Sequence, residues 1–179
     1  MRRAMRALRR IGLLALLALG GVPLARAEVT AAAPDHFTLR HEAVSSLPPD
    51  ALWARLTEPA AWWSSAHTYS GDAANLSLDT RPGGLWSEAW EAGTVAHGRV
   101  LFARDGRTLR LDAPFGPLQG MAVSTVWTVT LTPEADGTRV RFDVVANGSE
   151  RSGLDALAPA VDSVFTEAIG RLASPAPQE

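Results

Sequence analysis

The sequence of 179 residues contains neither cysteine nor lysine. Without cysteine the chain forms no disulfide, and both thiol chemistry and thiolate-bound metals are excluded. Without lysine there is no side-chain amine for Schiff-base or amine-nucleophile chemistry. The stability of the fold must therefore come from packing.

Several common catalytic patterns are also missing. The four histidines, His36, His41, His67 and His97, are scattered and show no paired metal-ligand spacing such as HExxH. The G-x-S-x-G pattern of serine hydrolases does not occur. We therefore expect no metal and no cofactor, and we expect His67 and His97 to lie at the surface.

The N-terminal segment has the pattern of a secretory signal peptide. Five arginines in residues 1–10 precede an apolar run over residues 11–19 that is too short to span a bilayer. Helix-breaking residues follow at 20–23, and Ala25-Arg26-Ala27 then places small side chains where a signal peptidase requires them. We expect cleavage after Ala27 and a periplasmic or secreted product with no membrane span. An uncleaved membrane anchor is the main alternative.

Removal of residues 1–27 leaves a chain of single-domain length. It carries 11 arginines against 19 acidic residues, a net charge of about −8, so a nucleic-acid partner is not expected. Residues 28–35 are rich in alanine, and residues 174–179 contain two prolines. Neither stretch shows the periodicity of a packed element, so both are expected to be flexible tails around a domain over residues 36–173.

The remaining pattern predicts an α+β domain. A strand is expected over residues 36–47, then a helix that starts at Pro48-Pro49-Asp50 and ends near residue 57 before Pro59, then a helical turn over residues 59–63. Six strands with alternating apolar residues follow, and an amphipathic helix with apolar residues at helical spacing closes the chain. The six strands are expected at residues 74–80, 85–92, 94–104, 108–113, 123–132 and 138–147, and the helix at residues 153–173. This helix is the only apolar element long enough to cover one face of an antiparallel sheet.

The order and spacing of four segments resemble the SRPBCC superfamily, which includes START-like lipid-binding domains, polyketide cyclase/dehydrase-like proteins and homologues of the heat-shock-protein ATPase activator. The segments are residues 47–59 (LPPDALWARLTEP), Trp62-Trp63, Arg81-Pro82-Gly83-Gly84, and Leu131-Thr132-Pro133 with Gly137-Thr138-Arg139-Val140. The resemblance implies a helix-grip fold, in which a curved antiparallel sheet of about seven strands wraps around the long C-terminal helix, with two short helices after the first strand. It also implies a cavity for a hydrophobic small molecule or lipid. It does not imply a reaction, because these proteins share no catalytic motif.

Alternation along the strands assigns side chains to the inner face. Apolar residues at 109, 111 and 113, at 123, 127, 129 and 131, and at 140, 142 and 144 should point inward. In the strand over residues 85–92, the alternate positions with the larger side chains are Trp86, Glu88 and Trp90. If these face inward, a carboxylate should lie between two indoles. Burial there would raise the pKa of Glu88, which is the best catalytic candidate, as a general acid or base, or an anchor for a polar ligand. Alternatively, Glu88 faces solvent or pairs with an arginine.

The domain is rich in aromatic side chains, which suit ligand pockets and ordinary cores equally. We expect about half of them to line a cavity. The apolar loop over residues 114–121 is either a gate to this cavity or only a long connection between strands. The candidate ligand-binding residues are Trp62, Trp63, Tyr69, Trp86, Glu88, Trp90, Phe102, Phe115, Met121, Trp127, Phe142 and Phe165.

Three functions remain open at this level. The leading hypothesis is a non-catalytic carrier of a hydrophobic or amphipathic small molecule beyond the inner membrane. The second is a cyclase-, dehydrase- or hydrolase-like enzyme in which Glu88, helped by Tyr69 or His67, moves a proton. The third is a protein-interaction module. The sequence names neither the ligand nor the oligomeric state.

Overall fold

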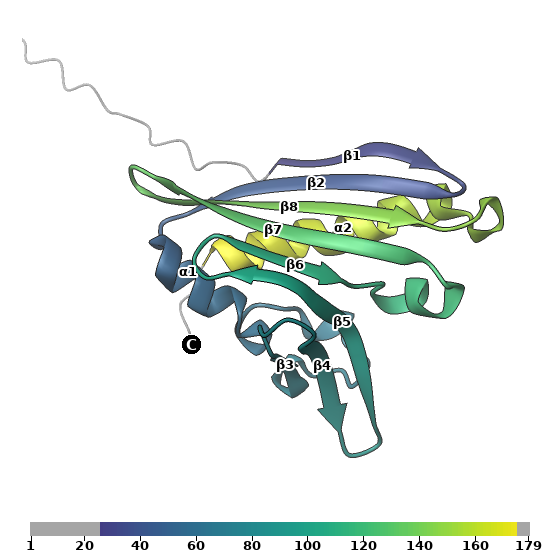
Figure 1. Ribbon diagram of the computed structural model, residues 1–179, viewed down its shortest axis with the longest axis horizontal. Helices are drawn as coiled ribbons and strands as arrows, with labels where there is room; N and C mark the ends of the chain where they lie inside the picture. Colours follow the sequence, from purple (N-terminus) through teal and green to yellow (C-terminus); the bar gives the residue numbers. More distant parts are fainter. Residues whose placement is uncertain (1–25, 175–179) are drawn as a thin grey trace, which may run out of the picture.

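The computed structural model describes residues 26–174, which form one antiparallel sheet and a long C-terminal helix (Figure 1). Residues 1–25, which hold most of the predicted signal peptide, and residues 175–179 lie outside the described part. The spatial order of the strands is β1-β2-β8-β7-β6-β5-β4-β3. The strands are β1 (Arg26–Ala33), β2 (His36–Ser45), β3 (Leu76–Leu78), β4 (Leu85–Trp90), β5 (Gly93–Arg104), β6 (Thr108–Asp112), β7 (Ser124–Glu134) and β8 (Gly137–Asn147).

Two α-helices and five short 3-10 turns complete the fold. They are α1 (Pro49–Leu56), η1 (Pro59–Ala61), η2 (Ser65–His67), η3 (Ala73–Asn75), η4 (Gly116–Met121), η5 (Glu150–Ser152) and α2 (Leu154–Ala173). In Figure 1, α2 lies behind the sheet at β2, β8 and β7, and α1 lies beside one end of α2. The predicted α+β helix-grip fold is confirmed, with eight strands rather than seven.

The inner face of the sheet carries the apolar residues that alternation assigned to it. All ten predicted inward side chains of β6, β7, β8 and the residues that flank them are at most 4% exposed. Arg110, Asp112 and Arg139 lie on the opposite parity and are exposed. The central strands therefore follow the simple period of two.

Helix α2 is amphipathic, and its apolar stripe supplies the other half of the core. Leu154, Phe165, Ile169 and Leu172 are almost fully buried. Arg55 of α1 donates hydrogen bonds to the carbonyl oxygens of Arg171 (3.1 Å) and Leu172 (3.2 Å) at the C-terminus of α2. A cation at this end complements the helix dipole and fixes α1 against α2.

The expected flexible tail over residues 28–35 is wrong for most of its length. Residues up to Ala33 belong to β1, which pairs with β2 from Arg26 to Ala33 with one register shift between Val29 and Ala31. The turn that follows is held by two backbone hydrogen bonds, from Leu154 N to Pro34 O (2.9 Å) and from Gly148 N to Asp35 O (2.8 Å). Backbone pairing at a sheet edge needs no apolar pattern, which is why the alanine-rich sequence gave no sign of the strand.

The segment between α1 and β4 contains less regular secondary structure than predicted. The predicted strand over residues 74–80 is reduced to β3, and the predicted turn at 59–63 is η1. These short elements curl over one end of the sheet and carry residues 62–70 toward α2. Among residues 26–174, no helix is long and apolar enough to cross a membrane.

Candidate ligand-binding site

A cavity of about 390 Å³ lies between the inner face of the sheet and the middle of α2. Residues 63–69 and the short helix η4 complete its wall. Its wall is mostly apolar. The residues that line it are Trp63, His67, Thr68, Tyr69, His97, Ala113, Phe115, Gly116, Pro117, Leu118, Thr125, Val144, Leu157, Ala160, Val161, Val164 and Phe165. Cavities of this size and character accept small organic molecules.

The predicted aromatic residues divide between the cavity and the core. Trp63, Tyr69, Phe115 and Phe165 line the cavity. The other four that the structure buries, Trp62, Trp86, Trp127 and Phe142, pack behind them in one aromatic cluster. Within it, the ring of Trp127 lies 5.0 Å from that of Phe142 and 5.2 Å from that of Phe165, both edge to face. The cluster forms a stiff back wall for the cavity.

Four further predicted binding residues are also absent from the cavity wall: Glu88, which lies behind His97, and Trp90, Phe102 and Met121. Trp90 is half-buried at the end of β4, and Met121 packs against the core at the end of η4. Phe102 is 46% exposed and pairs with the outward-facing Arg110 on the outer face of β5, so its prediction as a binding residue is wrong. The pairing of β5 with β6 shifts by one residue between Val100 and Phe102, and this β-bulge reverses the parity of Phe102.

A second β-bulge turns His97 inward, against the expectation of a surface histidine. Trp86 of β4 pairs with Gly98 and Ser87 pairs with Ala96, so His97 is the extra residue of the bulge. His97 is only 5% exposed and lines the cavity. Glycine follows it because a Cβ at position 98 would lie 2.7 Å from the Cβ of Ala113. Bulges commonly re-aim a side chain in this way beside functional sites.

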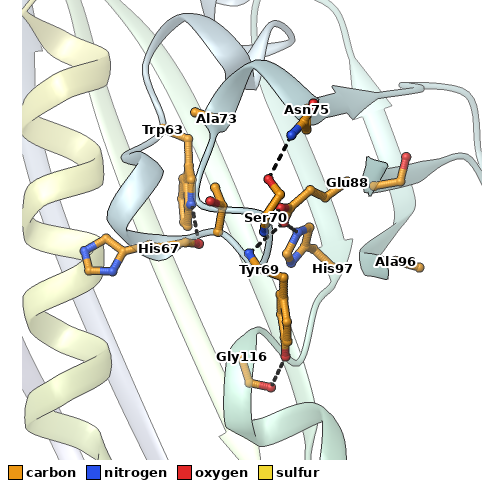
Figure 2. A network of polar contacts seen from close by, with 12 residues as sticks. Trp63, His67, Tyr69, Ser70, Ala73, Asn75, Glu88, Ala96, His97 and Gly116 are labelled. Atoms are coloured by element: carbon orange, nitrogen blue, oxygen red, sulfur yellow. Dashed lines mark hydrogen bonds and ion pairs between the residues drawn. The ribbon is translucent and has the colours of Figure 1, made fainter. Parts of the chain in front are cut away.

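Glu88 is fully buried and accepts hydrogen bonds from three donors (Figure 2). The backbone N–H groups of Tyr69 (3.0 Å) and Ser70 donate to it from the loop after η2. The third donor is Nε2 of His97, 2.9 Å from Oε2 of Glu88. Glu88 therefore joins β4, the loop and the cavity-lining histidine.

This environment changes the pKa of both members of the pair, and in one case the predicted direction is wrong. Burial alone would raise the pKa of Glu88, but the hydrogen bonds from Ser70, Tyr69 and His97 stabilise the carboxylate and hold its pKa below the ordinary value. Burial lowers the pKa of His97, against the opposing effect of Glu88. At neutral pH the pair is therefore an ionised carboxylate and a neutral imidazole.

The Glu88–His97 pair fixes how His97 can act. Because Nε2–H donates to Glu88, Nδ1 of the neutral ring is the acceptor nitrogen. Such a ring can accept a hydrogen bond or a proton from a molecule in the cavity, and Glu88 would stabilise the resulting imidazolium. In the described part of the chain, no group of three or more histidine, aspartate and glutamate side chains is arranged to hold a metal ion.

The mouth of the cavity lies between the segment that holds His67 and Tyr69 and the short helix η4. The first segment contacts both η4 and α2. Tyr69 is 55% exposed, and its hydroxyl donates to the carbonyl oxygen of Gly116 in η4 (3.3 Å), as Figure 2 shows. His67 Nε2 lies 2.9 Å from Oε2 of Glu167 on α2. The apolar loop predicted over residues 114–121 is thus largely the short helix η4, held by side-chain contacts at the mouth.

Two polar features of the site escaped sequence reasoning. Thr125 lines the cavity, is 2% exposed, and its hydroxyl has no hydrogen-bond partner among the described residues. Thr125 shares the alternate positions of Val123 and Trp127 along the strand, and this was the available signal that it points inward. The backbone donors of Tyr69 and Ser70 carry no sequence signal, because they depend on how the loop returns to β4.

Comparison with protein families and solved structures agrees with this geometry. Residues 36–176 match the family model described as polyketide cyclase / dehydrase and lipid transport. Comparison with the curated proteins gives no match. A Rhodobacter sphaeroides protein has 20% identity and a TM-score of 0.54, with 83% of this chain and 95% of that chain covered. A Rhizobium leguminosarum protein also has 20% identity and a TM-score of 0.54, with 84% and 95% covered.

The protein CalU16 of Micromonospora echinospora shares the fold as well. It has 17% identity and a TM-score of 0.50, with 84% of this chain and 85% of that chain covered. At these identities the solved structures show the fold alone, whereas the family model covers most of the chain. The chain belongs to the polyketide cyclase / dehydrase and lipid transport family of the SRPBCC superfamily.

Proposed function

We propose that this protein is an exported binder, or carrier, of a small hydrophobic or amphipathic molecule held between the sheet and α2. The observation that carries the proposal is the apolar cavity of about 390 Å³, which has only a few polar groups in its wall. Its aromatic wall is backed by a buried cluster and is therefore largely pre-formed. Pre-formed apolar cavities with few polar groups are typical of small-molecule sites.

Export is part of this proposal and rests on the sequence of residues 1–27. Cleavage after Ala27 would remove only the first two residues of β1 and leave Glu28–Ala33 paired with β2. The partners Glu28–Arg40 and Val29–Leu39 would remain. The predicted processing site is therefore compatible with an intact sheet.

The test is to block the mouth of the cavity and measure binding of a neutral fluorescent probe, N-phenyl-1-naphthylamine. Ala160 lines the cavity on α2, and Ala156 lies one turn earlier on the same helix, exposed and outside the cavity. We expect Ala160→Trp to lower probe affinity at least tenfold because the indole occupies the space that the probe needs. We expect Ala156→Trp to bind the probe as the wild type does.

Two results would contradict the proposal. One is a wild-type protein that does not increase the fluorescence of the probe. The other is an equal loss of affinity in Ala156→Trp and Ala160→Trp when both variants keep the wild-type melting temperature, because the probe would then bind elsewhere. Thermal unfolding of both variants therefore accompanies the titrations.

A second candidate function, acid–base catalysis on the bound molecule, is favoured by one observation. The neutral ring of His97 lines the cavity while its Nε2–H is held by the ionised Glu88. In this case His97 is the base, and Glu88 orients it. An enzyme predicts that substitution of His97 changes the chemical identity of the molecule retained by the protein, whereas a carrier predicts a change in its amount only.

A further inference from the structure

We propose that the cavity selects a neutral apolar molecule that carries a hydroxyl group, and that Thr125 and His97 are the residues that bind this hydroxyl. The proposal rests on the binding function proposed above and gives its ligand a chemical class. Three features of the cavity support it: an unpartnered buried hydroxyl, an imidazole acceptor, and the absence of arginine from the wall that the structure describes.

Thr125 supplies the first feature. It is 2% exposed and its Oγ1 has no partner among the described residues, although it belongs to a side chain that lines the cavity. A buried hydroxyl without a partner costs free energy, and a ligand group that donates to it or accepts from it would recover that cost. An entirely apolar ligand would leave the hydroxyl unpaired.

His97 supplies the second feature, on the same inner face of the sheet. Ala113 N donates to Thr125 O (2.8 Å), and the Cβ of Ala113 lies beside Gly98, so His97, Ala113 and Thr125 form a row across β5, β6 and β7. Two strand spacings separate the ends of the row, which is roughly 10 Å between backbones. Both side chains line the same cavity, so one small molecule can lie against both, with Nδ1 of His97 as an acceptor for its hydroxyl proton.

The charges around the cavity supply the third feature. No arginine is among the lining residues of the described chain, whereas two carboxylates lie close to them: Glu88 behind His97, and Glu167 beside His67 at the mouth. Burial keeps His97 neutral by lowering its pKa. A bound carboxylate would lose its hydration without gaining a cation, so the cavity disfavours ionised fatty acids and similar anions.

The experiment compares three probes with the same ring system in equilibrium titrations of the mature protein: 2-naphthol, 2-methoxynaphthalene and 2-naphthoate. The ether is neutral and more apolar but has no donor, and the naphthoate is an anion. We expect 2-naphthol to bind at least threefold more tightly than the ether and at least tenfold more tightly than the naphthoate. A cavity without polar recognition would prefer the ether, because apolar transfer alone favours it.

Two matched variants locate the hydroxyl site. Thr125→Val removes Oγ1 with little change in shape, and we expect it to lower 2-naphthol affinity three- to tenfold, to leave the affinity for the ether unchanged, and to leave the melting temperature equal or higher. Thr130→Val is the control, because Thr130 lies on the same strand with the outward parity. It should leave all three affinities unchanged.

The inference is wrong if the ether or the naphthoate binds as tightly as 2-naphthol, or if Thr125→Val does not weaken 2-naphthol. It is also wrong if N-phenyl-1-naphthylamine binds the wild type and 2-naphthol does not, a result that leaves the proposed function intact. If none of these compounds binds, the proposed function itself fails and the inference fails with it.

Discussion

Replacing Glu88 with alanine will lower the free energy of unfolding by about 3–5 kcal/mol, because the change leaves one buried and two partly buried donors without an acceptor. The donors are the backbone N–H groups of Tyr69 and Ser70 and Nε2–H of His97. Urea unfolding of the mature protein measures the effect. The same variant will release the loop that carries Tyr69 to the cavity mouth, so probe binding should fall as well.

Two further variants separate the role of Glu88 from a general effect of charge. Glu91→Ala removes an exposed carboxylate one residue beyond β4 and should change the free energy of unfolding by less than about 0.5 kcal/mol. Glu88→Gln keeps one acceptor oxygen, so its loss in the free energy of unfolding should lie between those of Glu88→Ala and Glu91→Ala. A loss in Glu88→Ala no larger than that in Glu91→Ala would show that Glu88 does not hold the loop and His97 together.

Truncation of Trp127 to alanine will also destabilise the protein by about 3–5 kcal/mol, the usual cost of removing a large buried aromatic side chain. Its fully buried ring packs on several others, including Phe142, Phe165, Trp86 and Phe115. The indole N–H has no partner among the described residues, so Trp127→Phe should cost much less than Trp127→Ala. Thermal and urea unfolding measure both changes.

The matched control for Trp127 is Trp90→Ala. Trp90 is half-buried at the end of β4, where its ring lies against Gly93. Its truncation should cost less than half as much as that of Trp127. Equal losses in the two alanine variants would contradict the view that the aromatic cluster behind the cavity, and not aromatic content in general, stabilises the domain.

The parts of the fold that the sequence predicts well are those with regular periodicity. Helix α2 and strands β6, β7 and β8 follow their expected patterns, because each has one face on the core and one in water. β1 escaped prediction because an edge strand of small residues is held by its backbone, and its sequence carries almost no apolar signal.

The candidate site is less predictable, because it depends on departures from that periodicity. The bulges at His97 and near Leu101 reverse the expected parity, which buries His97 and exposes Phe102. The burial of Glu88 follows from the inward alternation that it shares with Trp86. The direction of its pKa shift depends on backbone donors 19 and 18 residues earlier in the sequence. The register of strand pairing and the path of the loop after η2 thus determine the chemistry of the site.

The most direct test of the central claim is native mass spectrometry of mature protein purified from the periplasm of its own cells, with the Ala160→Trp variant prepared in parallel. We expect the wild type to retain a small neutral hydrophobic compound, and we expect Ala160→Trp to retain little or none. His97→Gln in the same experiment will show whether the retained compound changes in mass, as the catalytic alternative requires. A wild-type protein that carries no compound and does not bind N-phenyl-1-naphthylamine would contradict the proposed binding function.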